Sequence, residues 1–498
     1  MLRFASWIAC VWMSLAVLSA SGIAAESPEF EVVFDAKVHP GPITGRVYVM
    51  LDVPSGPREP RFGPDWFAPQ PFFAVDAKDW KAGEPLKFGK DAIGFPGPLK
   101  TLPPGIYRAQ AVVRLNPDTH AIGDGEGNAY GPVVRVEIGP EGQRPTKLTI
   151  DTVVPTKPFE ETDRLKLVDI ESKLLSAFHK RPVHMKAAVV LPEGLKPGQK
   201  VPTLYIIPGF GGDHRMARMF LQGGRGAYAQ DLIRVVLDPD CGTGHHVFAD
   251  SAFNGPHGLA LIEELIPHIE KTYPAIAEPG ARLLNGHSSG GWSSLWLQIT
   301  YPDFFGGTWS TSPDPVTFSD FQRIDLYAPG ENTFLDREGN RRPIARMGGK
   351  AVLFVDNFSK MEDVIGDGGQ LHSFEAVFSP LDRYGRPRPY YNRETGAVDA
   401  DVAKAWGKYD ILKILEKNWE LLAPKLKGKL HIYTGDIDTF YLEGAVKRLK
   451  DSLAKLGSDA AVEIIPDRDH GSILDAKMTK RLDLEIKAAT AQYRRDGQ

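Results

Sequence analysis

The sequence predicts an α/β protein in which a mostly parallel sheet, covered by helices on both faces, follows an all-β sandwich of the Ig-like type. Two patterns support this prediction. Residues 26–155 contain short apolar runs that alternate with polar residues and are separated by Pro and Gly, which is typical of the strands of a sandwich. Residues 184–498 instead alternate short buried-strand runs with amphipathic helical stretches, which is typical of a parallel sheet between helices.

Residues 1–25 are predicted to be a signal peptide. Arg3 precedes an apolar run that ends near Leu18, and the small residues Ala24 and Ala25 stand at the expected cleavage positions. The mature protein is therefore expected in a periplasm or outside the cell. An uncleaved membrane anchor is the alternative for this segment. No later segment has the ~20 apolar residues that span a bilayer.

The composition argues against several classes of partner. The chain has 498 residues and a formal net charge of -4, and it has no run of Lys and Arg. Neither nucleic acid nor a membrane surface is therefore an expected partner. Of the two cysteines, Cys10 lies in the signal peptide, which leaves Cys241 without a partner for an intramolecular disulfide. No oligomeric state is predicted.

Between these two regions the pattern is mixed. Residues 156–183 include "RLKLVDIESKLLSAFHK", whose apolar spacing is helical and predicts a linker or a first helix. Residues 316–427 interrupt the later strand–helix alternation with charged, proline-rich and aromatic sequence. They are predicted to form an insertion next to the site, as a lid or substrate platform. Their aromatic residues suit a sugar or phenolic ligand, and equally a small accessory core.

A candidate nucleophile lies in "LLNGHSSGGWSS", between a predicted strand and a predicted helix. The pattern Gly-x-Ser-x-Gly fits only with Ser288 at its centre, with Gly286 and His287 before it and Gly290 two positions after it. A serine on such a strand-to-helix turn presents its hydroxyl above the sheet edge. Ser288 is therefore the predicted nucleophile, which needs a base and donors for the oxyanion.

Two backbone N–H groups are expected to stabilise that oxyanion. One belongs to Ser289, which follows the nucleophile at a helix N-terminus. The other is expected in the loop of "LYIIPGFGGDH", which follows an earlier strand. Phe210 or Gly211 would donate it, and the sequence does not choose between them.

The acid and the base are expected after the serine, at the ends of later strands. The strand "AVEIIPD" is followed by "RDHGSI", which supplies His470 as the base. The strand "GKLHIYTG" is followed by "DIDTFYL", which offers Asp436 and Asp438 as the acid. Strand position alone leaves both aspartates as candidates.

The stretch "ARLLNGHSSGGWSSLWLQITYPDFFGG" resembles the putative-esterase group of α/β-hydrolases, which includes esterase D, feruloyl esterases and enterochelin esterases. The resemblance covers residues 184–490 and implies an α/β-hydrolase fold and an ester substrate. The acid of this group lies in a Gly-x-x-Asp-x-Phe pattern, which Gly435, Asp438 and Phe440 match, so the resemblance favours Asp438 over Asp436. An N-terminal β-sandwich is similar to the enterochelin-esterase arrangement, whereas the long insertion departs from the group.

These features predict an exported serine carboxylesterase that works through Ser288, His470, Asp438 and an acyl-enzyme. The expected substrate is a small-molecule or polysaccharide-linked ester. An acyltransferase with the same triad and a non-catalytic binding protein are the alternatives. No cofactor or metal is expected, because the spacing in the histidine-rich segment 245–257 matches no known metal site.

Overall fold

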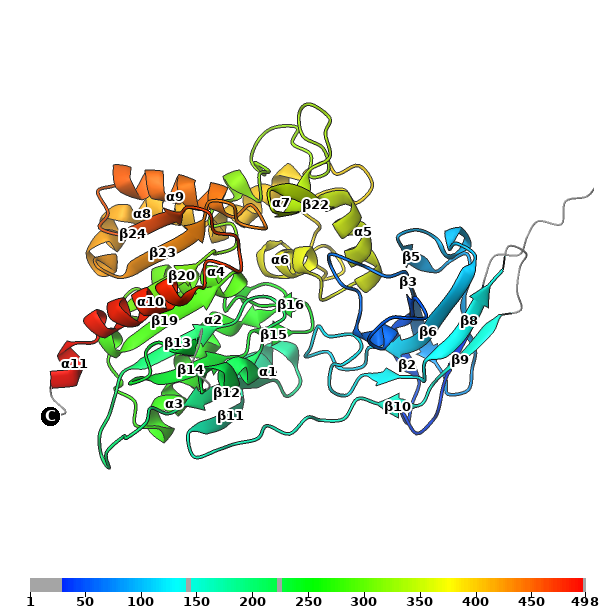
Figure 1. Cartoon of the computed structure of the whole chain (residues 1–498), viewed down its shortest axis with the longest axis horizontal. Helices are drawn as coiled ribbons and strands as arrows, with labels where there is room; N and C mark the ends of the chain where they lie inside the picture. The colour runs from blue at the N-terminus through cyan, green and yellow to red at the C-terminus, as the bar shows by residue number, and fades with distance from the viewer. Residues whose placement is uncertain (1–28, 140–144, 222–225, 496–498) are drawn as a thin grey trace, which may run out of the picture.

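The computed structural model describes residues 29–139, 145–221 and 226–495. The predicted signal peptide lies outside these residues. The described chain forms two sheets before residue 155 and an eight-stranded sheet after it, as Figure 1 shows. None of the described helices has both the length and the apolar character needed to cross a membrane.

The N-terminal module, residues 29–155, consists of two sheets. The smaller has the strand order β4-β1-β9, and the larger has the order β10-β7-β6-β2-β3-β5 with β8 paired to β6. Two short 3-10 turns, Pro60–Phe62 and Leu99–Thr101, lie between strands. The strands are β1 (Phe30–Phe34), β2 (Ile43–Asp52), β3 (Phe72–Trp80), β4 (Leu86–Phe88), β5 (Ile93–Phe95), β6 (Gly105–Val113), β7 (Ala129–Tyr130), β8 (Val134–Ile138), β9 (Thr146–Ile150) and β10 (Thr152–Val153).

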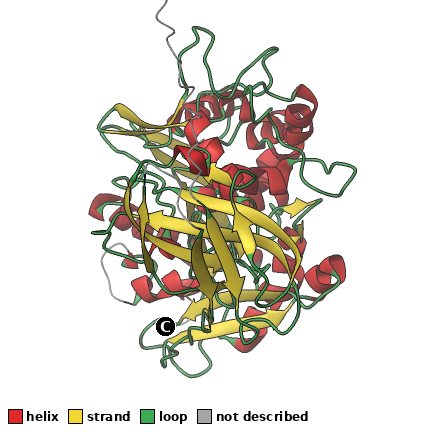
Figure 2. Ribbon diagram, turned by 90° about the vertical axis from the view of Figure 1, so that its right-hand side faces the viewer, coloured by secondary structure: helices red, strands yellow, loops and turns green. Residues whose placement is uncertain are grey.

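The larger sheet of the module is buried on both faces. Side chains alternate along β2, so that Val47, Val49 and Leu51 join the core between the two sheets. Tyr48 and Met50 point the other way and join a core shared with residues 316–427. This burial explains why β2 reads as a nearly continuous apolar run. Figure 2 views the molecule from the side of this module.

The eight-stranded main sheet has the order β11-β12-β14-β13-β19-β20-β23-β24. Strand β12 runs antiparallel to both of its neighbours, and every other neighbouring pair is parallel. The mostly parallel sheet that the sequence predicts is therefore present. Its strands are β11 (Leu165–Glu171), β12 (His184–Val190), β13 (Thr203–Ile207), β14 (Ile233–Leu237), β19 (Arg282–His287), β20 (Gly307–Thr311), β23 (Leu430–Gly435) and β24 (Ala461–Ile465).

Helices cover both faces of the main sheet. Tyr205 and Ile207 of β13 pack into a core that includes residues of the helices from α1 to α4, whereas Leu204 and Ile206 pack into a core with α10. The helices outside residues 316–427 are α1 (Lys173–His179), α2 (His257–Ala260), α3 (Ile266–Thr272), α4 (Ser289–Thr300), α9 (Glu443–Lys455), α10 (Ala476–Ala489) and α11 (Gln492–Arg495). A π-helical turn, Leu261–Leu265, joins α2 to α3.

Shorter elements connect these helices and strands. Two small hairpins follow β14, and two 3-10 helices lie before β14 and before β19. The hairpins are β15 (Asp240–Cys241) with β16 (Gly244–His245), and β17 (Asp250–Ser251) with β18 (Gly255–Pro256), and the 3-10 helices are His214–Phe220 and Pro279–Ala281.

The structure corrects the prediction of a linker or helix over residues 156–183. Leu165–Glu171 is the edge strand β11, which pairs antiparallel with β12 along its whole length, and only Lys173–His179 is helical. The apolar residues of this segment fit the period of a helix and that of a strand, and pairing with β12 makes it a strand. The main sheet therefore begins at Leu165 and not at residue 184.

Residues 316–427 join the N-terminal module to the main sheet (Figure 1). Helix α5 packs against β3 and β5 of the module, and helix α8 packs against α4 and α9 beside the main sheet. The elements of this insertion are β21 (Pro343–Met347), β22 (Lys350–Phe354), α5 (Val355–Ile365), α6 (Gln370–Phe378), α7 (Ala400–Trp406), α8 (Ile411–Leu426) and the 3-10 turns Phe318–Asp320 and Gly407–Tyr409.

Most of the aromatic residues that the sequence singles out in the insertion form an accessory core. Tyr384 is the exception on the surface, with 73% of its area exposed, and Phe374 borders the cavity described below. The others belong to one buried cluster or pack against it: Phe318, Phe321, Tyr327, Phe334, Phe378, Tyr390, Tyr391, Trp406 and Tyr409. Packing in an accessory core, and not ligand binding, therefore accounts for most of these aromatic residues.

Candidate active site

The carboxyl edge of the main sheet brings together the loops that the sequence singles out. Strands β13, β19, β20, β23 and β24 are parallel neighbours in the sheet, so the loops that follow them emerge at the same edge. This edge is where open α/β sheets hold their ligands. The loops contain, in chain order, Phe210, Ser288, Asp314, Asp438 and His470.

Ser288 lies in a strained turn between β19 and α4. Its φ is 60° and its ψ is -127°, a conformation that L residues rarely adopt. The flanking glycines allow this turn to pack closely. A Cβ on Gly286 would lie 2.0 Å from the carbonyl oxygen of Gly290, and a Cβ on Gly290 would lie 1.9 Å from that of Ile207. The Gly-x-Ser-x-Gly pattern is therefore a steric requirement of the backbone.

His470 and Asp438 form a hydrogen-bonded pair beside this turn. The Nδ1 of His470 lies 2.8 Å from Oδ2 of Asp438, whose other oxygen accepts a hydrogen bond of 2.9 Å from the N–H of Phe440. Burial alone would raise the pKa of Asp438. The hydrogen bond and the charge of His470 outweigh burial and hold the pKa of this carboxyl below its ordinary value.

Asp436 takes a different position. Its Oδ1 accepts a hydrogen bond of 2.8 Å from the N–H of Asp467, so this side chain closes the loop that carries the histidine. The acid loop and the histidine loop approach each other closely, because a Cβ on Gly435 would lie 1.9 Å from the carbonyl oxygen of Arg468. Of the two aspartates left open by strand position, Asp438 is the one that contacts His470.

Arg346 contacts the loop of Asp438, here called the acid loop, and no sequence pattern predicted this contact. This residue belongs to β21 of the insertion, more than ninety positions before the loop that it contacts. Its Nε donates to the carbonyl oxygen of Asp438 at 2.9 Å, and its Nη2 forms an ion pair of 2.7 Å with Glu443. No local motif marks such a residue, because its partners are distant in sequence.

The loop after β13 lies directly against the Ser288 turn. A Cβ on Gly209 would lie 3.1 Å from the carbonyl oxygen of His287 and 3.2 Å from Cβ of Ser288. Phe210 borders the cavity at Ser288, whereas Gly211 borders a second cavity on the other side of this loop. The loop that holds both proposed backbone donors therefore lies next to the serine.

The side chain of Ser289 is bonded to a neighbouring carboxylate. Its Oγ donates a hydrogen bond of 2.5 Å to Oδ2 of Asp314, and both side chains are buried. Burial raises the pKa of Asp314 to about 6, although the hydrogen bond from Ser289 and the charge of His470 lower it in part. The imidazole of His287 lies against that of His470, with ring centroids 4.5 Å apart.

A largely apolar cavity of about 280 Å³ opens at Ser288. Three parts of the chain form its walls. The main sheet edge contributes Gly209, Phe210, His287, Ser288, Asp314, Pro315, Phe440 and His470, and the insertion contributes Gln322, Ile344, Leu353, Phe358, Gln370 and Phe374. The N-terminal module contributes Trp66.

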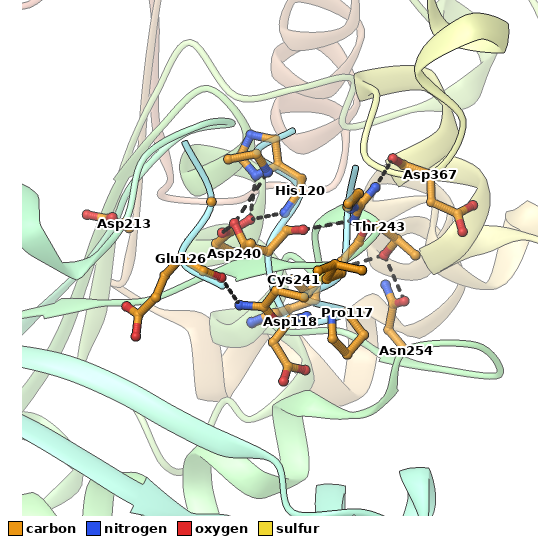
Figure 3. Close-up of a pocket in the computed structure, with 18 of the residues that line it drawn as sticks. Pro117, Asp118, His120, Glu126, Asp213, Asp240, Cys241, Thr243, Asn254 and Asp367 are labelled. Carbon is orange, nitrogen blue, oxygen red and sulfur yellow. Dashed lines mark hydrogen bonds and ion pairs between the residues drawn. The ribbon is translucent and has the colours of Figure 1, made fainter. Parts of the chain in front are cut away.

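A second, polar cavity of about 1630 Å³ lies between the N-terminal module and the main sheet, and Figure 3 shows part of it. Many of its polar groups pair with each other across the two parts. Asp240 accepts hydrogen bonds from Thr119 at 2.7 Å and pairs with His120 at 2.5 Å. Arg181 forms an ion pair with Asp118 across the same contact, and within the later part Thr243 donates to Asn254 at 2.9 Å. The cavity therefore lies at a polar contact between the two parts.

The histidine-rich segment 245–257 supports the loop after β13. His245 Nε2 lies 2.9 Å from the carbonyl oxygen of Pro208, and the rings of His246 and His257 stack with centroids 3.7 Å apart. Asp250 accepts hydrogen bonds from the first N–H groups of α2. Within residues 29–139, 145–221 and 226–495, no group of three or more His, Cys, Asp or Glu side chains is arranged to hold a metal ion.

Comparisons with known proteins found similar structures and one matching family model. Solved structures similar to this chain include a ferulic acid esterase (15% identity, TM-score 0.39, 66% of this chain and 99% of the other). They also include an S-formylglutathione hydrolase from Agrobacterium tumefaciens (15%, 0.38, 65% and 94%) and a ferulic acid esterase from Anaeromyces mucronatus (15%, 0.32, 68% and 95%). No curated protein matches the sequence. A family model described as "Putative esterase" matches residues 180–340, which hold Phe210 and Ser288, so this segment is similar to the putative-esterase family.

Proposed function

We propose that this protein is an exported serine carboxylesterase with Ser288 as nucleophile, His470 as base and Asp438 as orienting acid. One observation carries the proposal: the strained Ser288 turn and His470 border the same cavity, and Nδ1 of His470 is paired with the buried Asp438 behind it. The family match supports an esterase. Export and the Ig-like nature of the N-terminal module are parts of the proposal that come from the sequence alone.

The proposed reaction uses a hydrogen-bonding pattern typical of such triads. Asp438 engages Nδ1 of His470, which leaves Nε2 free to take the proton of Ser288 as Oγ attacks the ester carbonyl. The N–H group of Ser289 and that of Phe210 or Gly211 would then hold the negative oxygen. His470 returns the proton to the leaving alcohol, which departs as the acyl-enzyme forms. Water repeats the sequence and releases the acid.

Covalent labelling tests the proposal. A fluorophosphonate probe should react with the purified protein, and peptide mapping should place the label on Ser288. Hydrolysis of a panel of short acyl, long acyl, feruloyl and acetyl-sugar esters should show turnover of at least one class. A protein that takes up no label and hydrolyses no ester in the panel would not be the enzyme proposed. Addition of an alcohol or sugar acceptor to the same assay distinguishes transfer from hydrolysis by the products formed.

A further inference from the structure

The N-terminal module reaches the cavity through one side chain. Trp66 lies in the loop between the Pro60–Phe62 turn and β3, far in sequence from the other residues that border the cavity. Its ring centroid lies 5.0 Å from that of Phe358 in an edge-to-face arrangement and 5.6 Å from that of Phe210. Trp66 therefore closes an aromatic wall whose other members come from the insertion and from the loop after β13.

The same wall extends to the catalytic histidine. The ring of Trp66 lies 6.3 Å from that of Phe440, and the ring of Phe440 lies 4.9 Å from the imidazole of His470. A ligand group in this cavity would contact Trp66 on one side and lie near Ser288 and His470 on the other. Flat rings of this kind bind apolar or aromatic groups through their faces and edges.

Contacts elsewhere hold the module, and with it Trp66, in place. Tyr48 donates a hydrogen bond of 2.6 Å to the carbonyl oxygen of Ile365 at the end of α5. Arg46 donates to the carbonyl oxygen of Asp363 at 2.8 Å, and Arg114 donates to those of Asp367 and Gly242. The face of the larger sheet that carries Tyr48 and Met50 packs on helix α5. These contacts dock the module on the insertion, so the Trp66 side chain has a defined position in the wall.

We infer that the N-terminal module is part of the active site, and that Trp66 determines selectivity for esters that carry a ring-sized apolar group. This inference rests on the proposed function, because the cavity must accept an ester for its wall to select one. The volume of about 280 Å³ and the apolar walls suit a single ring better than a charged or extended group. The module therefore has a direct role in substrate binding besides its role in the fold.

Three small esters, one without a ring and two with a ring on different sides of the ester bond, test this inference, because their intrinsic reactivities cancel when variants are compared on the same ester. Ethyl acetate has none, ethyl benzoate has one on the acyl side, and phenyl acetate has one on the alcohol side. The measurement is kcat/KM by titration of the acid released, expressed as the ratio of each ring ester to ethyl acetate. For Trp66→Ala, one of the two ratios should fall by about 10- to 50-fold, since the ring loses an apolar wall in the transition state.

Two further variants keep the test decisive. Trp66→Phe keeps an aromatic wall and should lower the same ratio by less than Trp66→Ala. Phe67→Ala is the matched control, because Phe67 is the next residue, is 40% exposed and contacts Phe440 without bordering the cavity. Its ratios should equal those of the wild type. Circular dichroism and thermal unfolding confirm that each variant is folded before its ratios are compared.

The possible failures are distinguishable. If all three esters lose activity equally in Trp66→Ala, the residue holds Phe210 and Phe440 in place and does not select the substrate, which overturns the inference. Unchanged ratios in both Trp66 variants overturn it as well. If the wild type hydrolyses none of the esters and Ser288 takes up no fluorophosphonate label, the proposed function itself fails.

Discussion

The reactive side chains and the walls around them are built in different ways. Ser288, Asp438 and His470 follow parallel strands of one sheet, and each lies within a few residues of a strand end. The walls of the cavity combine this sheet edge with a module near residue 66 and an insertion near residues 322–374. The proposed chemistry thus depends on one sheet edge, whereas the shape of the cavity depends also on the docking of distant segments. Substitutions in the two regions should therefore have different consequences.

The largest effect is expected at the nucleophile. Ser288→Ala should lower kcat by roughly 10⁴-fold or more, because nucleophile and base act as one unit. Steady-state kinetics on the ester of the panel that the wild type hydrolyses best measure this loss of kcat.

Ser289→Ala is the matched control for Ser288→Ala. Ser289 contributes its backbone N–H to the proposed mechanism, and its Oγ is bonded to Asp314. Loss of the hydroxyl should lower kcat by less than about 10-fold, since the backbone donor stays in place. A larger loss in Ser289→Ala than in Ser288→Ala would mean that the nucleophile is assigned to the wrong serine.

The next effect separates the two aspartates of the acid loop. Asp438→Asn should lower kcat by about 10⁴-fold with little change in stability, because the amide favours the wrong tautomer of His470. Asp436→Asn should cost much less, since that side chain bonds only to the N–H of Asp467 in the described loop. The kcat values of both variants on the same ester show which aspartate orients the histidine. Equal and small losses would show that another carboxylate, such as Asp314, orients the histidine.

A smaller effect tests how far the insertion reaches into the chemistry. Arg346→Met removes the donors that hold the carbonyl oxygen of Asp438 and leaves Glu443 without its ion pair. We expect kcat to fall by about 10-fold with little change in KM, because the acid loop loses its precise position. Arg346→Lys should restore part of the loss.

Arg341→Met is the matched control for Arg346→Met. Arg341 lies just before the same strand, β21, and pairs with Asp356 on the surface, where its side chain is 44% exposed. Its substitution should leave kcat unchanged. Equal losses in Arg341→Met and Arg346→Met would mean that the hairpin as a whole, and not the bond to the acid loop, affects catalysis.

The smallest effect concerns stability and not turnover. Burial raises the pKa of Asp314 from 3.8 to about 6. A carboxyl with a higher pKa in the folded state stabilises the fold fully below its unfolded-state pKa, and this contribution is lost as the pH rises through the folded-state pKa. The free energy of unfolding of the wild type, relative to Asp314→Asn, should therefore fall between pH 4 and pH 7 by on the order of 2 to 3 kcal/mol. Urea denaturation at each pH measures it, and a difference that does not change with pH would contradict the expected burial of this carboxyl.

The nature of the sequence signal explains which predictions the structure matched. The strand–turn–helix around Ser288 depends on glycines two residues away, where any Cβ would meet backbone within about 2 Å. Such local steric requirements are visible in a short stretch of sequence. The strand Leu165–Glu171 is harder to predict from the sequence. An edge strand with mixed burial has no clear hydrophobic period, and its strand conformation depends on pairing with β12. The choice of Asp438 needed a family pattern, since both aspartates follow the same strand.

The sequence by itself therefore determined the mostly parallel sheet, the position of Ser288 on its turn, and the order of serine, acid and histidine along the chain. Only the tertiary structure decided that Trp66 borders the cavity, that Arg346 contacts the loop of Asp438, and that the aromatic residues of the insertion mostly pack with each other. The physical reason is the range of the interactions. Backbone geometry at a tight turn is encoded by neighbouring residues, whereas the cavity wall and the Arg346 contact form only when segments far apart in the sequence pack together.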